Sequence, residues 1–336
     1  MKIAILMAGG YALSPSTDGR KSQILYQAAA LERIGHEVAR LNPWESYSLE
    51  QFDAVHIVEG GLGNIPGVFG RIQGVKKMGM ATFIDTSTSN MLYRSLTRMG
   101  RLHPRLITQQ GLFYRQAQVC DVVIARSRDE ERLLVRGIGV PQEKVRIVLN
   151  GVNPPGPVDV EGVRRELGIA GDFALHISMF TQARKNVVRL IEAVGPLNIP
   201  LVIAGTAGAA EDLKPVEAAA RAFPTVKILG RLTQRQRDSL YAACRVFCLP
   251  SIYEGTGLVA LEAASHGAAV VITRHGGPPD YFADLAEYVE PLDVANIREA
   301  IRRAWEKPRD GRLQAHVLEK LSWDHSARSL AAAYGG

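Results

Sequence analysis

Short apolar runs alternate with amphipathic segments along almost the whole chain. The segments between the runs, such as 22–34 and 187–194, carry apolar positions at helical spacing. This alternation predicts βαβ units, which build parallel sheets with helices on their faces. The expected strands are residues 2–7, 37–41, 54–58, 81–84, 122–125, 145–149, 173–178, 200–204, 226–229, 245–249 and 268–273.

The runs fall into two sets, each large enough for one doubly wound parallel sheet. Between the sets lies the most turn-rich stretch of the chain, NGVNPPGP over residues 150–157, and a helical segment begins soon after it, at Val160. We therefore expect an α/β protein with two Rossmann-like domains that face a cleft. The first would span residues 1–150 and the second residues 151–321.

Composition excludes several classes of protein. With 336 residues, 46% of them hydrophobic and 22% charged, the chain can bury two cores and is too apolar for intrinsic disorder. The most apolar stretch, 257–273, is interrupted by a glutamate and a histidine, so no membrane span is expected. The apolar run within residues 1–10 is too short for a signal peptide. Cys120, Cys244 and Cys248 fit neither a disulfide framework nor a metal site, which predicts buried thiols in a cytoplasmic protein.

The excess positive charge lies entirely in the first half of the chain. Residues 1–150 contain 19 Lys and Arg against 13 Asp and Glu, a net charge of +6, whereas residues 151–336 contain 21 of each. The stretch 86–120 has no acidic residue, and four of its arginines recur every three or four residues, so they would share one helix face. These are Arg94, Arg98, Arg101 and Arg105. The pattern favours an anionic membrane surface or a phosphorylated partner, or it is a solvated face. No nucleic-acid-binding motif accompanies the charge, so nucleic acid is not an expected partner.

The most informative segment follows the predicted strand 245–249. It reads PSIYEGTGL and runs into a predicted helix that contains Glu262. Glycines on both sides of Thr256 let the backbone approach a ligand closely, and amides at a helix start can bind phosphate or sugar oxygens. Helical rise alone would separate Glu254 from Glu262 by about 12 Å. Two carboxylates so placed could each accept hydrogen bonds from a diol, one at either end of a nucleotide sugar.

The longer segment 250–267, PSIYEGTGLVALEAASHG, resembles the signature of the retaining GT-B glycosyltransferases of family four, which use nucleotide sugars. The resemblance extends over most of the chain. Residues 150–153 are similar to the family's domain linker, 120–127 to the preceding strand, and 275–280 (HGGPPD) to its glycine loop. Residues 322–334 resemble the last helix, which in the family crosses back onto the first domain, so we expect the stretch 322–336 to pack there.

The resemblance implies a role for each matching residue. Glu254 would contact the donor sugar and Glu262 the ribose hydroxyls. Lys185 would neutralise the diphosphate leaving group, whose developing charge a preplaced cation stabilises without a metal; the alternative is an exposed residue at a helix start. The further donor-binding positions are Ser251, Gly255, Thr256, Gly257, Leu258, Gly205 and Arg231.

The chain departs from the family pattern beside Lys185. The family usually has an arginine five or six residues before this lysine, and Met179 and Phe180 occupy those positions here. Arg184 is the candidate replacement, and it enters the predicted catalytic set with Glu254 and Lys185. Thr256 stands where a bulky aromatic side chain is common, which alters the shape of the pocket rather than excluding activity.

The first domain offers candidates for binding the acceptor. Ser16 in the first loop, with Gly19 and Arg20 at the start of the next helix, could meet a phosphate or belong to a solvated flexible loop. Glu59 and Gly60 follow a predicted strand and form a second candidate.

Two further polar residues lie in or after predicted strands of the first domain. Asp85 follows the predicted strand 81–84, where many family members place a histidine that reaches the reacting sugar. It could bond a donor or acceptor hydroxyl as a catalytic residue, or cap the next helix. His56 lies inside a predicted strand, so we expect it to be packed and hydrogen-bonded rather than catalytic.

The resemblance implies transfer of a sugar from a nucleotide-diphosphate donor, UDP or GDP being favoured, to a glycan, a lipid-linked acceptor or a small molecule. The resemblance also implies that the transferred sugar retains its anomeric configuration and that the reaction requires no metal or other cofactor. An epimerase or phosphorylase on the same fold is a rival, although no context for a pyridoxal lysine is present. The alternative from another class is a catalytically silent subunit that binds a glycan or a protein. The corresponding location is the cytoplasm, where the protein would bind peripherally to the inner face of the membrane.

Overall fold

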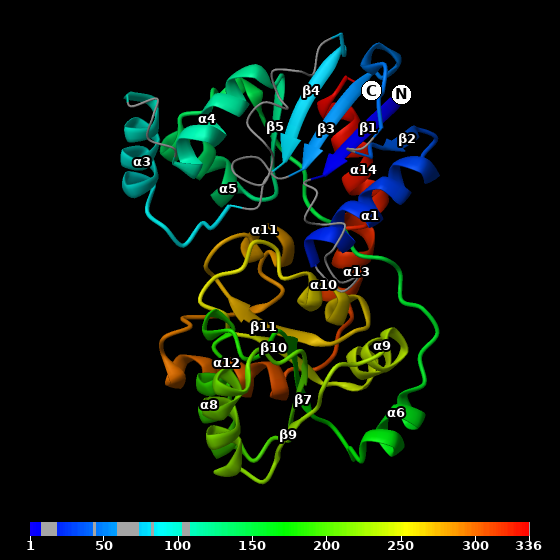
Figure 1. Ribbon diagram of the computed structural model, residues 1–336. Coiled ribbons are helices and arrows are strands. Elements are labelled where there is room, and N and C mark those ends of the chain that lie inside the picture. The colour runs from blue at the N-terminus through cyan, green and yellow to red at the C-terminus, as the bar shows by residue number, and fades with distance from the viewer. Residues whose placement is uncertain (8–18, 43–44, 59–73, 82–83, 103–107, 336) are drawn as a thin grey trace. The chain divides into compact units, whose positions relative to one another are not determined.

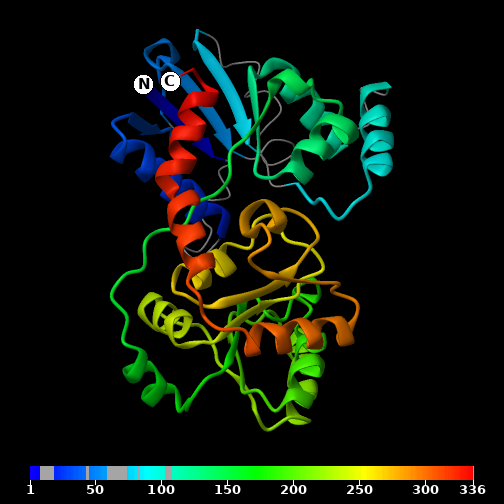
Figure 2. The same cartoon turned by 180° about the vertical axis from the view of Figure 1, so that it is seen from behind.

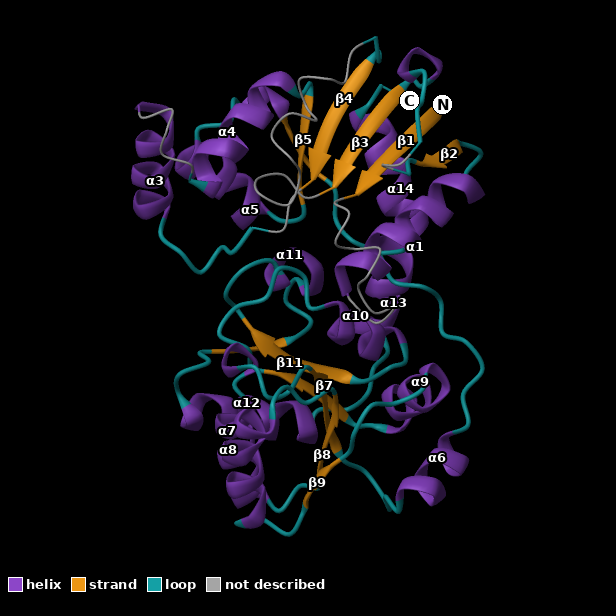
Figure 3. Ribbon diagram, viewed as in Figure 1, coloured by secondary structure: helices purple, strands orange, loops and turns teal. Residues whose placement is uncertain are grey.

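The computed structural model divides the chain into two compact units, Met1–Gly151 with Ser322–Gly336, and Val152–Leu321. It describes residues 1–7, 19–42, 45–58, 74–81, 84–102 and 108–335. Over these described residues, each unit is built on one sheet of six parallel strands (Figures 1 and 3). The predicted α/β class with two Rossmann-like parallel sheets is confirmed.

The sheet of the first unit has the strand order β2-β1-β3-β4-β5-β6. Its central strands are buried on both faces, as parallel sheets covered by helices require, and β3 is buried at every position. The strands are β1 (Lys2–Met7), β2 (Glu37–Arg40), β3 (Ala54–Val58), β4 (Lys77–Ala81), β5 (Val122–Ala125) and β6 (Val145–Ile147).

The predicted strand 81–84 is wrong. The strand in this place, β4, ends where the prediction began, at Ala81, and pairs in register with β3 and β5. It contains no β-branched residue, so its propensity for a strand is weak, and its central Gly79 allows the Tyr334 ring to approach. Asp85 therefore lies four residues beyond the end of the strand rather than at its end.

Helices cover this first sheet. The last helix, α14 (Trp323–Ala333), packs against α1 (Gly19–Arg33), and Figure 2 shows the two side by side. Hydrogen bonds join them, from Gln27 to the Ser326 hydroxyl at 3.2 Å and from Arg33 Nη2 to Asp324 at 2.6 Å. The other helical segments are η2 (Leu49–Gln51), α3 (Asn90–Leu102), α4 (Gln109–Val119), α5 (Arg128–Arg132), the π-helical turn η4 (Leu133–Ile138) and η5 (Gln142–Lys144).

The sheet of the second unit has the strand order β12-β11-β10-β7-β8-β9. Chain order runs outward from β7 to β9 on one side and from β10 to β12 on the other. The topological switch point, where ligands bind in doubly wound folds, therefore lies between β7 and β10. The strands are β7 (Ala174–Ser178), β8 (Leu201–Gly205), β9 (Val226–Ile228), β10 (Val246–Leu249), β11 (Ala269–Thr273) and β12 (Glu287–Val289).

Sequence patterns predicted five of these six strands within one residue at each end and missed β12, which has only three residues. An apolar cluster of this unit packs between the sheet and the helices α7 and α12. The helical segments are α6 (Val160–Leu167), η6 (Ala183–Lys185), α7 (Val187–Val194), η7 (Gly195–Leu197), α8 (Ala210–Arg221), α9 (Gln234–Ala243), α10 (Leu258–Ser265), α11 (Pro278–Phe282), α12 (Val294–Glu306) and α13 (Arg312–Lys320).

Among the residues that the structure describes, no helix is long and apolar enough to cross a membrane. The three cysteines are buried and free, as expected.

Candidate functional site

Two loops meet at the switch point of the second sheet, one after β7 and one after β10. Asn186 holds them together: its backbone is left-handed (φ 61°), a conformation that asparagine tolerates, and its side-chain amide donates to the carbonyls of Pro250 and Pro291 at 2.9 and 2.5 Å. The amide of Ile252 also donates to the carbonyl of Arg184 at 2.8 Å. The local backbone therefore fixes the residues on either side of the switch point.

These loops bring Lys185 and Glu254 into contact. Lys185 Nζ donates to Glu254 Oε1 at 2.6 Å, and the Ser251 hydroxyl donates to the same oxygen at 2.7 Å. Only 10% of the lysine side chain and 9% of the glutamate side chain are exposed. The alternative of an exposed lysine at a helix start is thus wrong, and the buried cation and carboxylate satisfy one another.

Arg184 lies at the outer edge of this cluster. Its Nη1 is 3.8 Å from Glu254 Oε1, and its guanidinium carbon is 5.8 Å from the centre of the Tyr253 ring. Met179, at a position where the family arginine is expected, is exposed, and Phe180 is buried. Arg184 is the candidate replacement that this structure offers, and it lies beside Glu254.

Glu254 is ionised despite its burial. Desolvation alone raises the pKa of its carboxyl group, but the charges of Lys185 and Arg184, with the hydrogen bonds from Lys185 and Ser251, outweigh it. The pKa of Glu254 is therefore below its ordinary value. The site keeps a negative group and a positive group in contact at neutral pH.

The glycine loop after β11 fixes the backbone of Glu254 from the other side. The Glu254 amide donates to the His275 carbonyl at 3.2 Å, and the Gly277 amide donates to the Glu254 carbonyl at 3.0 Å. Between them, Gly276 adopts a φ of +96°, and a Cβ atom on it would lie 2.1 Å from the Glu254 carbonyl oxygen. Only glycine fits this position, which explains the first glycine of the pair that follows the strand.

The segment from Gly255 to Leu258 carries the chain from this cluster into α10. Thr256 is buried, and its hydroxyl donates to the Tyr281 hydroxyl at 3.3 Å. Gly257 takes the left-handed conformation (φ 79°) at the N-cap, and Leu258 is the first residue of the helix. Because the helix begins only there, Glu262 lies about one turn into it, and only part of the stretch between the two glutamates is helical. The separation of about 12 Å derived from helical rise therefore does not apply to the two glutamates.

Glu262 is held by two residues of α9 that the sequence analysis missed. The Tyr241 hydroxyl donates to Glu262 Oε2 at 3.0 Å, and Arg237 Nε lies 3.8 Å from the same oxygen. Burial raises the pKa of Glu262 above its ordinary value, although Arg237 and the Tyr241 hydrogen bond oppose the shift. Tyr241 and Arg237 lie four residues apart, about one turn of α9, but nothing in that segment of the sequence marks them as partners of Glu262.

A further buried polar residue beside the cluster, His176 on β7, was also missed. Its Nδ1 is 2.7 Å from the Cys248 carbonyl oxygen and its Nε2 is 2.7 Å from the Ser178 hydroxyl. Burial lowers the pKa of His176 to about 4, so the ring is neutral at pH 7. A neutral ring donates through Nδ1 and accepts through Nε2, which joins the ends of β7 and β10.

The other predicted donor-binding positions lie at the end of the neighbouring strand. Gly205 ends β8 with a φ of +124°, and a Cβ atom on it would lie 2.0 Å from the Ser178 carbonyl oxygen. Its amide donates to the carbonyl of Gly230 at 3.2 Å, which places the loop that contains the exposed Arg231 beside the end of β8.

The predicted acceptor residues of the first unit are described only in part. Ser16, Glu59 and Gly60 lie outside the described residues. Gly19 and Arg20 are the first residues of α1, as predicted.

The two remaining polar candidates of the first unit make hydrogen bonds within that unit. Asp85 accepts from the amide and the hydroxyl of Ser87, at 2.8 and 2.6 Å, in a turn that precedes α3. This is a turn within the loop and not the predicted cap of the next helix, because the Leu92 amide in the first turn of α3 donates to the Ser89 hydroxyl at 3.3 Å instead. His56 is buried, and its Nδ1 is 2.7 Å from the Tyr334 hydroxyl, which confirms that it is packed and hydrogen-bonded.

The chain was compared with known families and proteins. Residues 164–318 match the family described as "Glycosyl transferases group 1". An uncharacterized glycosyltransferase of Methanocaldococcus jannaschii is 27% identical over 241 residues, which cover 66% of this chain and 60% of that protein. The O-antigen chain mannosyltransferase B of Escherichia coli is 31% identical over 191 residues, 54% of this chain and 45% of that protein. The chain thus matches about half the length of these curated relatives.

Solved structures share the fold. HepE from Anabaena, in complex with UDP, superimposes over 100% of this chain and 100% of its own, with a TM-score of 0.73 at 16% identity. The same protein in complex with UDP-glucose gives a TM-score of 0.70. At this identity the likeness concerns the fold.

Proposed function

We propose that this chain, which belongs to the glycosyl transferases group 1 family through residues 164–318, transfers a sugar from a nucleoside-diphosphate donor to an acceptor. One observation carries the proposal: Lys185 and Glu254 meet at 2.6 Å at the switch point of the second sheet, within that matched segment. Buried groups of opposite charge at this edge are suited to a ligand that is both anionic and polyhydroxylated.

The chemistry assigned to this cluster is stabilisation of a leaving group. Breaking the bond between the sugar and the diphosphate develops negative charge on the diphosphate, and the Lys185 ammonium supplies a preplaced positive charge. Arg184, 3.8 Å from Glu254, is positioned to add a second cation. Glu254 accepts hydrogen bonds from hydroxyls of the donor sugar and fixes its orientation.

The nucleoside end of the donor is assigned to α10. Glu262 accepts hydrogen bonds from the ribose hydroxyls, with Tyr241 and Arg237 holding its carboxylate in place. The amides of Gly255–Leu258 lie between the two glutamates in sequence and bind the sugar and phosphate oxygens. Gly205, Arg231 and Ser251 complete the proposed donor set.

We propose a retaining reaction that needs no metal. The acceptor hydroxyl attacks the face that the diphosphate leaves, and the diphosphate takes up the acceptor's proton, so no carboxylate nucleophile is required. The donor is a UDP- or GDP-sugar; UDP-glucose is the ligand in one structure of the similar HepE protein. The charge that a divalent cation supplies elsewhere comes here from Lys185 and helix amides.

The acceptor is a glycan, a lipid-linked compound or a small molecule, and α3 favours a role at the inner, anionic face of a membrane. On this helix Met91 and Leu102 are 79% and 75% exposed. Arg94, Arg98 and Arg101 are exposed on the same helix, while Arg105 lies outside the described residues. Apolar and basic side chains together suit an anionic bilayer surface. Pelleting with anionic vesicles that falls with salt supports this role, and equal pelleting with neutral vesicles contradicts it.

The test of transfer uses radiolabelled UDP- and GDP-sugars with the full chain. Release of labelled sugar, or its transfer to an acceptor, should fall at least a hundredfold in Glu254→Gln, because an oriented charge contact worth about 3 kcal/mol in the transition state is lost. Glu217→Gln, an exposed glutamate of α8 in the same unit, is the matched control and should be unchanged. Full turnover in folded Glu254→Gln would contradict the assignment.

The second candidate, a catalytically silent subunit, is favoured by the absence of an arginine at Met179 and Phe180. It predicts that the chain binds a nucleoside diphosphate or a glycan but releases no labelled sugar from any donor. Turnover by the wild-type chain decides between the two candidates.

A further inference from the structure

Described residues of the first unit line two neighbouring cavities that the proposed function leaves unused. They lie where β4 and β5, adjacent parallel strands, end at one edge of the sheet. One cavity is formed mainly by the helix that follows β5. The other also includes the segment 86–90, which follows β4. Ligands of doubly wound folds bind beyond this edge of the sheet, although the switch point of this sheet lies between β1 and β3, so the cavities share the edge but not the switch point.

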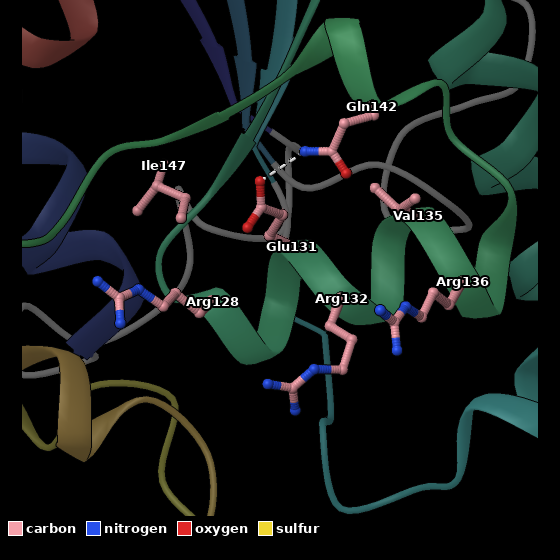
Figure 4. A pocket seen from close by; sticks show the side chains of 7 residues that line it. All are labelled: Arg128, Glu131, Arg132, Val135, Arg136, Gln142 and Ile147. Carbon is pink, nitrogen blue, oxygen red and sulfur yellow. Dashed lines mark hydrogen bonds between the residues drawn. The ribbon is translucent and has the colours of Figure 1, made fainter.

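The first cavity is rich in arginine. It has a volume of about 280 Å³ and is lined by Arg128, Glu131, Arg132, Val135, Arg136, Gln142 and Ile147. Figure 4 shows the three guanidinium groups on one side of α5 and η4, from successive helical turns. On the other side, Glu131 accepts a hydrogen bond from the Gln142 amide at 2.7 Å. The cavity therefore combines a row of cations with a carboxylate that already has a neutral partner.

The charge of this row is only partly balanced. Arg136 forms no ion pair within the described part of the chain, and Arg132 pairs with Asp129 at 2.7 Å, where 53% of the arginine and 33% of the aspartate side chain are exposed. An exposed pair of this kind is weak. An anionic ligand can therefore compete with Asp129 for Arg132 at little cost.

The second cavity is rich in hydroxyl groups. It has a volume of about 260 Å³, shares Arg132 with the first, and is lined by Thr86, Ser87, Thr88, Ser89, Asn90, Asp129 and Leu133. The hydroxyls of Ser87 and Ser89 are used in local turns. Those of Thr86 and Thr88 have no hydrogen-bond partner among the residues that the structure describes. Two threonine hydroxyls thus remain to bind a polar ligand beside the arginine row.

The helix that carries the arginines is firmly anchored. Arg126 and Glu130, both buried, form an ion pair, and the Arg126 amide donates to Glu130 Oε2 at 2.7 Å. The buried Ser127 hydroxyl caps the helix by accepting from the Glu130 amide at 3.1 Å. The arginine row thus projects from a rigid base, which lowers the entropic cost of binding.

We infer that these two cavities form one site for a phosphate-bearing polyol, and that this compound is the acceptor of the proposed transferase. The arginines bind the phosphate, because a planar guanidinium donates two parallel hydrogen bonds to phosphate oxygens. Thr86 and Thr88 bind hydroxyls of the polyol, and Arg132 lies between the two regions. Only the role of the bound compound as acceptor rests on the proposed function. The inference that the cavities bind a phosphate-bearing polyol does not depend on it.

The test is calorimetric titration of the full chain at low salt with glucose 6-phosphate and with glucose. Glucose 6-phosphate should bind, and glucose should bind at least tenfold more weakly, since the phosphate contacts are missing. Arg136→Gln should weaken binding of glucose 6-phosphate about tenfold, the loss of one hydrogen-bonded charge. Thr88→Val should weaken it a few-fold. Arg40→Gln, which removes an exposed arginine from β2 of the same unit, is the matched control and should bind as the wild type does.

A second arm separates a soluble acceptor from a lipid-borne one. Geranyl phosphate replaces glucose 6-phosphate in the same titrations. Stronger binding of either compound, weakened by Arg136→Gln, supports the site and identifies the source of the phosphate. Absence of binding by both compounds, or equal binding to the wild type and Arg136→Gln, overturns the inference.

The donor site could itself bind a phosphate, so Lys185→Gln is titrated as well. Unchanged affinity for glucose 6-phosphate in Lys185→Gln, together with the loss in Arg136→Gln, assigns the binding to the first unit. Affinity lost only in Lys185→Gln contradicts that assignment. Arg136→Gln is also assayed for transfer to the phosphorylated acceptor. An unaltered KM would show that this site does not bind the acceptor, and the proposed function would be unaffected.

Discussion

The two units present charged groups at the same edge of similar sheets, but they balance the charge differently. In the second unit, Lys185 and Glu254 are buried and paired with one another. In the first unit, Arg128, Arg132 and Arg136 are exposed along one helix. Burial explains the difference, since a charge removed from water must have a strong partner within the fold, whereas an exposed charge is stabilised by water and needs at most a weak partner, such as Asp129 for Arg132.

This contrast separates two ways of building a site. The cluster in the second unit is coupled to folding, because its residues are held by loops whose geometry depends on Asn186, Gly276 and Ser251. The arginine row contributes to binding without contributing to the core. Substitutions should therefore change stability in the second unit and ligand affinity alone in the first.

The largest effect is expected for Lys185→Met. Removing the ammonium leaves the Glu254 carboxylate buried without its main partner, which should lower the free energy of unfolding by about 3–5 kcal/mol. Chemical denaturation measures the loss. Lys214→Met, an exposed lysine paired with the exposed Glu211 at 3.3 Å, is the control and should cost less than about 1 kcal/mol. The double variant Lys185→Met/Glu254→Leu should recover most of the stability. If Lys185→Met costs no more than Lys214→Met, and the double variant recovers nothing, then the buried Lys185–Glu254 pair does not stabilise the fold as stated.

Gly276→Ala should cost somewhat less, about 3 kcal/mol. Its φ of +96° strains an alanine. The new Cβ atom would also lie 2.1 Å from the Glu254 carbonyl oxygen, so that carbonyl would have to move. Gly171→Ala tests the strain alone, because Gly171 has a φ of +69° and open space around it; about 1 kcal/mol is expected there. Thermal unfolding compares the two, and equal costs would show that the contact with Glu254 is unimportant.

The two glutamates should affect acid stability with opposite signs. The pKa of Glu254 is lowered by folding, so its contribution is present above the unfolded pKa of about 4.5 and is lost as pH falls through the folded value. The pKa of Glu262 is raised, so its contribution is present at low pH and is lost as pH rises through the folded value. Unfolding measured from pH 3 to 7 for the wild type, Glu254→Gln and Glu262→Gln should give difference curves of opposite slope. Parallel curves would contradict these pKa shifts.

The smallest effect is expected for Arg136→Gln in the first unit. An exposed side chain with no ion pair among the described residues should change the free energy of unfolding by less than about 0.5 kcal/mol. Denaturation under the conditions used for Lys185→Met measures it. A loss of 2 kcal/mol or more would mean that the arginine row is structural.

Most strands could be predicted because their apolar runs are short and rich in β-branched residues. β1, β3 and β5 have the predicted bounds, whereas β4 lacks β-branched residues and depends on the contact of Gly79 with Tyr334, far away in sequence. Such a long-range contact leaves no local pattern.

The candidate site could be predicted where its residues lie in one segment. Glu254, Gly257 and Glu262 were singled out from a single stretch of sequence. Tyr241 and Arg237, which hold Glu262, lie on a different helix, and nothing in their own segment marks them. The arginines of α5 and η4 are ordinary surface residues in sequence, and only the topology brings Arg132 beside the segment 86–90.

The most direct test of the central claim, that the second unit binds a nucleotide through α10 and the Lys185–Glu254 pair, is calorimetric titration with UDP, GDP, ADP and TDP, first without metal and then with magnesium. We expect one diphosphate to bind without metal and its affinity to fall at least tenfold in Glu262→Gln, which removes a charged acceptor for the ribose hydroxyls. Glu217→Gln should bind as the wild type does. Binding of none of the four, or binding that Glu262→Gln leaves unchanged, would contradict the account.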